Sequence, residues 1–153
     1  ECINVFNKYK NCKLTIIGSL NKIYNKYYEY LKSIITNKNI KIIINATEDT
    51  KNYYLQKSKY IINCTGLTCK HICNYEHFGI SIIEGINNDC IPISINIGYP
   101  SYYLNAEYLF KDINSLDTKI KHIINKKLVL NKIILPRKFN YKEFESQLSE
   151  FIK

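Results

Sequence analysis

Unbroken apolar runs alternate with amphipathic stretches along this chain, and that alternation restricts its fold more than any other feature. The runs lie at residues 13–17, 40–45, 60–64 and 91–95, with a shorter one at 108–110. Each run is apolar throughout rather than at every second residue, which indicates strands buried on both faces, as in a parallel sheet. The sequence therefore predicts an α/β fold, a Rossmann-like parallel sheet with helices on both faces.

The stretches between the runs carry apolar residues at helical spacing. The first such face comprises Cys2, Val5, Phe6 and Tyr9, and the clearest stripe spans residues 20–35. Further helices are expected at residues 48–58, 80–88 and 116–124, and from Asn140 to the end of the sequence. The last helix has an apolar face with Phe144, Leu148 and Phe151, which we expect to pack against another domain.

Length and composition fit one domain. The 153 residues can bury a core without disulfides, and no run approaches the roughly 20 apolar residues of a membrane span. We therefore expect a cytoplasmic protein with reduced cysteines. Because the sequence holds no methionine, we expect Glu1 not to be a natural start and the chain to be a fragment.

The charge of the chain is basic but dispersed. A formal net charge of +9 would ordinarily favour nucleic acid. The lysines are scattered along the whole chain, however, and the single arginine is Arg137. The scatter indicates a solvated lysine surface rather than a specific nucleic-acid interface, which would need the lysines on one face.

The segment from Glu76 to Glu84 has the pattern of an anion site. Gly79 stands where a helix is expected to begin, and the amides of Gly79, Ile80 and Ser81 would point out of the helix start toward a diphosphate. Glu76 and Glu84 would then flank that diphosphate and accept protons from hydroxyl groups. In the alternative interpretation, Glu76 only caps the helix and Glu84 is a solvated helix residue.

The same segment resembles a known family. Glu76-His77-Phe78-Gly79-Ile80 followed by Glu84 resembles the E-x7-E motif of retaining GT-B glycosyltransferases, and most closely the mannosyltransferase-like family 4. Four flanking stretches resemble further motifs of that family in the right order: residues 64–67, 89–93, 96–98 and 139–144. The resemblance covers the chain from about Lys13 onward.

The resemblance implies that the chain is the C-terminal, donor-binding domain of a two-domain enzyme. It implies that Glu76 is catalytic, holding the hydroxyls of the donor sugar, and that Glu84 binds the ribose. It places further donor contacts at His77, Phe78, Gly79, Ile80, Ser81 and Gly98, and we expect the loop ending at Thr47 to touch the base. The implied reaction is a metal-independent transfer of a hexose, with retention, from GDP-mannose or a UDP-hexose to a carbohydrate, lipid-linked or protein acceptor.

Two parts of such an enzyme have no counterpart in the sequence. The N-terminal acceptor domain is missing, and nothing before Lys13 matches the first strand of the donor domain, which carries an arginine and a lysine for the diphosphate. Residues 1–153 are therefore expected to be a single nucleotide-sugar-binding domain that lacks both parts and is inactive alone. The alternative is a degenerate, non-catalytic nucleotide-sugar-binding or scaffold module.

Cysteine, histidine and tyrosine clusters suggest further sites. Cys64, Cys69, His71 and Cys73 fall within ten residues, but their spacing is not that of a zinc finger or ribbon, so we expect no metal. A nucleophilic Cys69 or Cys73 is also disfavoured, because no oxyanion pair is arranged for it. The cluster of Tyr99, Tyr102 and Tyr103 should border the donor site, where a ring could pack on sugar or base.

Overall fold

The computed structural model describes residues 1–68, 71 and 75–134. The helices are α1 (Cys2–Asn7), α2 (Asn25–Ser33), α3 (Glu48–Lys57), α4 (Ile80–Asn87), α5 (Pro100–Tyr103) and α6 (Ile113–Ile124), with single turns η1 (Lys22–Tyr24) and η3 (Ala106–Tyr108). The strands are β1 (Leu14–Gly18), β2 (Ile40–Ile44), β3 (Tyr60–Asn63), β4 (Ile91–Ile95) and β5 (Leu109–Phe110). Strands and helices alternate for most of the described chain, as the sequence predicts.

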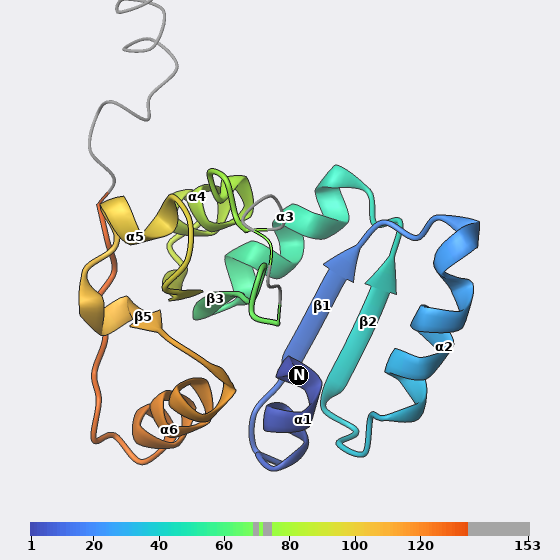
Figure 1. The fold of residues 1–153 in the computed structure, drawn as a ribbon, viewed down its shortest axis with the longest axis horizontal. Helices are drawn as coiled ribbons and strands as arrows, with labels where there is room; N and C mark the ends of the chain where they lie inside the picture. The colour runs from blue at the N-terminus through green and yellow to red at the C-terminus, as the bar shows by residue number, and fades with distance from the viewer. Residues whose placement is uncertain (69–70, 72–74, 135–153) are drawn as a thin grey trace, which may run out of the picture.

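All strand pairs are parallel, but the strands form two separate sheets. β1 pairs with β2 from Leu14–Ile40 to Gly18–Ile44, and β3, β4 and β5 form the second sheet in that order. Figure 1 shows the β1–β2 sheet beside α2, and the second sheet on the other side of the molecule. Within the described residues, β1 therefore pairs only with β2, and β3 only with β4.

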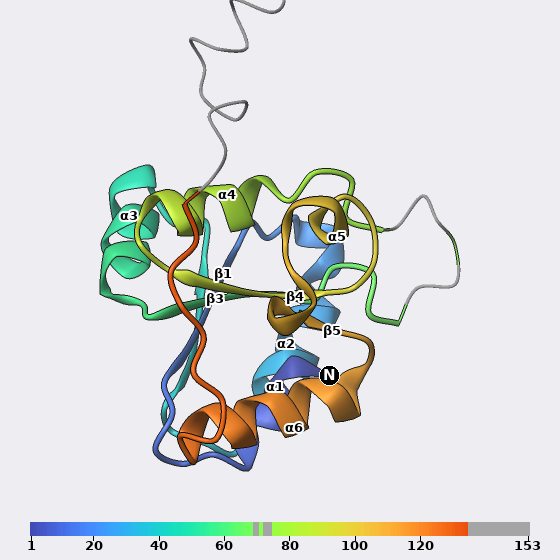
Figure 2. The same cartoon turned by 90° about the vertical axis from the view of Figure 1, so that its left-hand side faces the viewer.

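Helices cover both faces of the second sheet. In Figure 2, α3, α4 and α5 lie on one side of β3 and β4, while α1 and α6 lie on the other. Since both faces are covered, the central strand β4 is buried along its whole length. The Rossmann-like α/β fold predicted from the apolar runs is confirmed.

The core lies between the second sheet and its helices. Ile93 and Ile95 of β4 are fully buried, and so are Ile82 of α4 and Leu116 of α6, the helices on opposite sides of that strand. Gly85 permits the close approach of α4 to the sheet, because a Cβ there would come within 2.6 Å of the side chain of Ile61. This contact fixes the height of α4 above β3, and with it the position of the helix start.

Several element boundaries differ from the expected ones. The first strand is Leu14–Gly18 rather than residues 13–17, and the shorter run divides into the turn η3 and the two-residue strand β5. Helix α6 begins at Ile113, before the first apolar residue of its stripe, because Asp112 and Ser115 form a reciprocal capping box. The short helix α5 has no apolar periodicity and was missed.

Some expectations fall on residues that the structure does not describe, and one concerns membrane-spanning helices. Arg137, the stretch at residues 139–144 and the helix expected from Asn140 lie outside the described residues. In the part of the chain that is described, none of the helices combines the length and the apolar character that crossing a bilayer requires.

Candidate functional site

The Glu76 carboxylate is held at the start of α4. Its Oε1 accepts a hydrogen bond from the Gly79 amide at 2.9 Å, and its Oε2 accepts one from the Asn63 side chain at 3.3 Å. Gly79 has a φ of 85°, a left-handed conformation that favours glycine, and it turns the chain into the helix. Asn63 is buried at the end of β3, so the carboxylate lies at the carboxyl end of a strand, where α/β folds place ligands.

A second loop fixes the backbone of Glu76. The Glu76 carbonyl accepts a hydrogen bond from the Tyr99 amide at 3.2 Å. Gly98, with a φ of 77°, lies so close that a Cβ there would overlap this carbonyl oxygen. The structure therefore brings Glu76, Gly79 and Gly98 together, although Gly98 is 22 residues from Glu76 by their numbers.

The first amides of α4 are available to a ligand. The Gly79 amide is already used by Glu76, so it does not point freely at a diphosphate as the sequence interpretation expected. Across the described residues, no acceptor pairs with the Ile80 or Ser81 amide, and both side chains are exposed. These two amides and the positive end of the helix dipole form a polar site suited to an anion.

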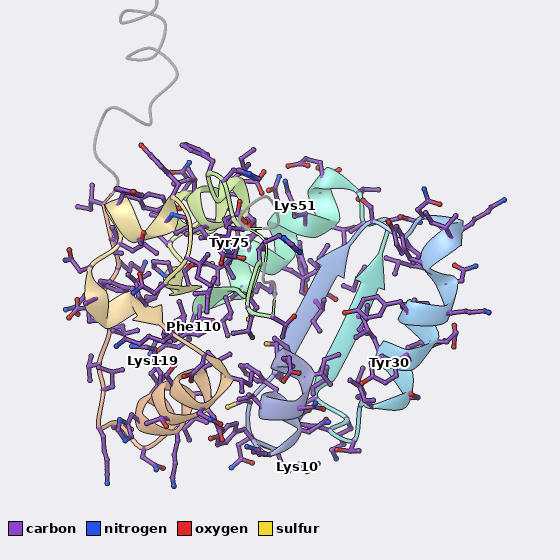
Figure 3. The ribbon with its side chains drawn as sticks, viewed as in Figure 1. Lys10, Tyr30, Lys51, Tyr75, Phe110 and Lys119 are labelled. Carbon is purple, nitrogen blue, oxygen red and sulfur yellow. The ribbon has the colours of Figure 1, made fainter. Side chains whose placement is uncertain are left out.

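Glu84 pairs with a lysine that the sequence interpretation missed. Lys51 Nζ lies 2.7 Å from Glu84 Oε1 and 2.9 Å from Glu48 Oε1, so it joins α3 to α4. The hydrogen bonds that Lys51 donates to Glu84 and Glu48 raise the pKa of Lys51, which keeps its ammonium charged at neutral pH. Figure 3 shows Lys51 reaching from α3 toward the space beside β1.

A cleft of about 1160 Å³ runs between β1 and β3. Its walls are residues 14–17 of β1 and Tyr60–Asn63 of β3, and Lys51, Ser81 and Glu84 also line it. Lys51, Ser81 and Glu84 belong to segments that follow the carboxyl ends of β2 and β3. Lys13 and Lys59 line the cleft just before β1 and β3, so this β1–β3 cleft is mostly apolar along the strands and polar at both ends. Glu76 does not line it; the two glutamates of the segment occupy neighbouring but different surroundings.

Aromatic rings gather beside Glu76. The Phe78 and Tyr99 rings stack with centroids 5.5 Å apart, and Tyr102 and Tyr103 lie 5.6 and 5.9 Å from Tyr99. The Tyr103 hydroxyl donates to the Phe78 carbonyl at 3.2 Å, and burial, with the nearby Glu76 charge, raises the pKa of Tyr103 to about 12. The tyrosine cluster therefore borders Glu76.

The family of the chain follows from a comparison of its sequence. Residues 2–144 match the family described as glycosyl transferases group 1. The chain belongs to the group 1 glycosyltransferases. Since the match spans nearly the whole chain, the Glu76 surroundings and the β1–β3 cleft are parts of a glycosyltransferase domain. No curated protein matches the chain.

Two further residues expected to contact the donor in this glycosyltransferase domain are His77 and Thr47. His77 is exposed, and the Thr47 hydroxyl accepts a hydrogen bond from the Thr50 amide, so Thr47 caps α3. Contact of either residue with a donor stays a prediction. Within residues 1–68, 71 and 75–134, no three histidine, cysteine or acidic side chains converge as a metal site, and Cys69 and Cys73 lie outside that part.

Two polar residues of the site were not predicted as such. Asn63 was not among the residues expected at the site, and the hydrogen bond that it donates to the Glu76 carboxylate gives it a role there. Lys51 carried no signal, because it is one of many lysines and lies 33 positions from Glu84. An amphipathic helix whose lysine follows an acidic first turn is common, and the sequence does not show which partner that lysine meets.

Proposed function

We propose that this group 1 glycosyltransferase domain binds a nucleoside-diphosphate hexose and transfers the hexose with retention of its anomeric configuration. One observation carries the proposal: carboxylates before and inside α4 flank the Ile80 and Ser81 amides, which have no acceptor among the described residues. The hydroxyl groups of a sugar and of a ribose require hydrogen-bond acceptors, and the diphosphate between them requires hydrogen-bond donors.

Glu76 is assigned to the donor sugar. Each of its carboxylate oxygens receives one protein hydrogen bond, and a carboxylate has about four lone-pair sites, so it can still accept from two sugar hydroxyls. The Gly79 amide orients the carboxylate before the ligand arrives. The aromatic cluster of Phe78, Tyr99 and Tyr102 offers ring faces beside it, on which a sugar can pack.

The donor is GDP-mannose or a UDP-hexose, and the acceptor is a carbohydrate, a lipid-linked group or a protein. The donor diphosphate meets Ser81 and Ile80, Glu84 meets the ribose, and Thr47 and Gly98 lie at the edges of the site. No metal takes part, since amides and the helix dipole offset the phosphate charge. A cytoplasmic location is part of the proposal, and the four free cysteines of the described chain suit a reducing compartment.

The open β1–β3 cleft supports the proposal that a further strand completes this domain, which in our proposal works together with a separate acceptor domain. The order β2-β1-cleft-β3-β4-β5 corresponds to the Rossmann order 3-2-1-4-5-6 with the central position open. A strand preceding α1 would reach that position by a right-handed crossover. In a polypeptide that includes it, the cleft-facing amides of β1 and β3 will exchange hydrogen more slowly than in residues 1–153. Equal exchange would argue against this completion.

A Glu84→Ala variant will test the donor site. We expect calorimetric titration of wild-type protein with UDP, GDP and their sugar conjugates to show binding of one base. We expect Glu84→Ala to weaken that binding about 10- to 100-fold, since a hydrogen bond to a charged group contributes roughly 1.5–3 kcal/mol. Glu107→Ala, at an exposed position outside the cleft, is the matched control and should bind as the wild type does.

A scaffold without nucleotide binding is the second candidate, and one observation favours it. Both glutamates already have protein partners, Glu76 in Gly79 and Asn63, and Glu84 in Lys51. On this alternative, the two carboxylates stabilise only α4. Wild-type protein that is folded yet binds none of the nucleotides, in a polypeptide that includes the further strand and the acceptor domain, would support the scaffold and reject the donor site.

A further inference from the structure

Lys51 is the cation of the β1–β3 cleft closest to Glu84. Its ammonium has three donor hydrogens. Among the described residues its recorded partners are Glu84 and Glu48, so one donor remains for a ligand. The Lys51 side chain is only 27% exposed and that of Glu84 37%, so both groups are held in the wall of the cleft.

Lys51 offsets the negative charge that Glu84 brings near an anionic ligand. Glu84 alone would place a negative charge near the Ile80 and Ser81 amides and repel a diphosphate. The Lys51 ammonium is shared between Glu84 and Glu48, so it reduces this repulsion, while Glu84 Oε2 has no recorded partner in the described chain. The carboxylate is thus oriented through one oxygen and open at the other.

We propose that Lys51 and Glu84 together recognise the vicinal diol of the donor ribose, and that Lys51 makes binding specific for ribonucleotides. This proposal rests on the nucleotide-sugar function proposed above and names a further specificity-determining residue for it. Glu84 Oε2 accepts a hydrogen bond from one ribose hydroxyl, and the remaining Lys51 N–H donates one to the oxygen of the neighbouring hydroxyl. A diol offers both a donor and an acceptor, so it matches one carboxylate beside one ammonium.

Specificity follows from what a deoxynucleotide would leave unpaired. Without its 2′-hydroxyl, the ligand still displaces water from around Lys51 and Glu84 but leaves one of their remaining hydrogen-bonding positions unused. A site built to bind a hydroxyl rejects the analogue that lacks it, because the desolvated polar group loses its hydrogen bond. We expect wild-type protein to bind its ribonucleoside diphosphate about 10- to 100-fold more tightly than the 2′-deoxy analogue.

The experiment compares this preference in variants. The four common ribonucleoside diphosphates and their 2′-deoxy analogues are titrated into the wild type, Lys51→Met, Lys51→Arg and Lys32→Met. Lys51→Met should reduce the ribose preference to less than about 3-fold, whereas Lys51→Arg should retain most of it because the cation remains. Lys32→Met removes a comparable i,i+3 pair, Lys32–Glu29 on α2, and should leave the preference unchanged.

A double variant separates a shared role from two independent ones. Glu84→Gln alone should lower the ribose preference, and Lys51→Met added to it should lower it little further, because both residues bind one diol. The preference ratio also distinguishes recognition from stability: a merely structural Lys51 would weaken ribo- and deoxyribonucleotides equally.

The outcomes that overturn the proposal are distinct. An unchanged ribose preference in Lys51→Met, with tight nucleotide binding, rejects the role of Lys51 and leaves the proposed function standing. Equal weakening of both nucleotide classes also rejects it, since Lys51 would then only support α4. Absence of binding of all eight nucleotides to folded wild-type protein in its complete polypeptide rejects both the role of Lys51 and the proposed function.

Discussion

Replacement of Gly98 by alanine is expected to lower the free energy of unfolding by about 3 kcal/mol or more. Two costs combine at this residue. Its φ of 77° is a conformation that residues with a side chain rarely adopt, and the new Cβ would overlap the Glu76 carbonyl oxygen. That oxygen belongs to the backbone and accepts the Tyr99 amide, so it cannot move aside without breaking the contact between the two loops.

The measurement is thermal or chemical unfolding followed by circular dichroism. For a chain of this size, the expected loss corresponds to a fall of about 10 °C in the midpoint. Gly18→Ala is the matched control, because Gly18 has no heavy atom within 4 Å of the added Cβ and no positive φ. A Gly98→Ala variant as stable as Gly18→Ala would show that Gly98 does not pack closely against the backbone of Glu76.

The effect should extend from stability to binding. Glu76 can keep its carboxylate near Gly79 only while its backbone stays in place. Protein carrying Gly98→Ala, measured well below its unfolding midpoint, should therefore bind nucleotide sugars more weakly than the Gly18→Ala control does. Unchanged binding would separate the loop contact from the donor site.

The fold was largely predictable because the apolar runs record burial. Residues 91–95 are apolar or small throughout, and the corresponding strand is buried along its length between helices on both faces. The boundaries that failed depend on polar caps. Asp112 and Ser115 start α6 ahead of its apolar stripe, and Pro100 begins a four-residue helix. Such local hydrogen bonds and fixed dihedrals add no periodicity, so hydrophobic spacing does not reveal them.

The separation into two sheets was not predictable from these runs. Strand pairing depends on which edges meet in space, and the sequence of β1 resembles that of a fully paired strand. The isoleucines of β1 and β3 are only partly buried, whereas the same residue type in β4 is buried completely. An apolar sequence therefore indicates that a strand is suited to burial. At the open β1–β3 cleft, two such strands are only partly buried.

The candidate site was predictable in part, for an equally physical reason. Glu76 and Gly79 act across one turn, so their spacing alone indicated a helix start with a carboxylate beside it. Gly98 was predicted as a site residue from its motif. Its close contact with the Glu76 carbonyl could not be predicted, because the two loops meet only in the folded chain. Lys51 belongs to another helix, and no local pattern connects it to Glu84. Interactions between elements required the structure.

Glu76→Gln is expected to separate the support that Glu76 gives to the helix from its proposed contact with the donor sugar. A glutamine oxygen can still accept the Gly79 amide, so the loss of stability should be small. We expect the free energy of unfolding to fall by about 1 kcal/mol, because the negative charge at the helix start is lost and the hydrogen bond from Asn63 is weakened. Glu76→Ala removes the acceptor altogether and should cost about 1–2 kcal/mol more.

Ligand binding should respond differently from stability. In Glu76→Gln, the nucleoside diphosphate should bind as in the wild type, because the proposed contact of residue 76 is with the sugar and not with the nucleotide. The nucleotide sugar should bind about 10-fold more weakly, since its hydroxyls lose a charged acceptor. In the complete polypeptide, transfer should fall about 100-fold or more, because the proposed contact of Glu76 with the sugar lies near the reacting carbon.

The comparison of nucleotide with nucleotide sugar decides what Glu76 does. Glu107→Gln removes one exposed charge and should change neither affinity, so it controls for net charge. If Glu76→Gln binds both ligands as the wild type does and transfers sugar at the same rate, Glu76 is only the cap of α4. If only the sugar-bearing ligand and the transfer rate respond, the Gly79 amide holds this carboxylate in place for the sugar, and the glycine at 98 preserves that arrangement from the opposite loop.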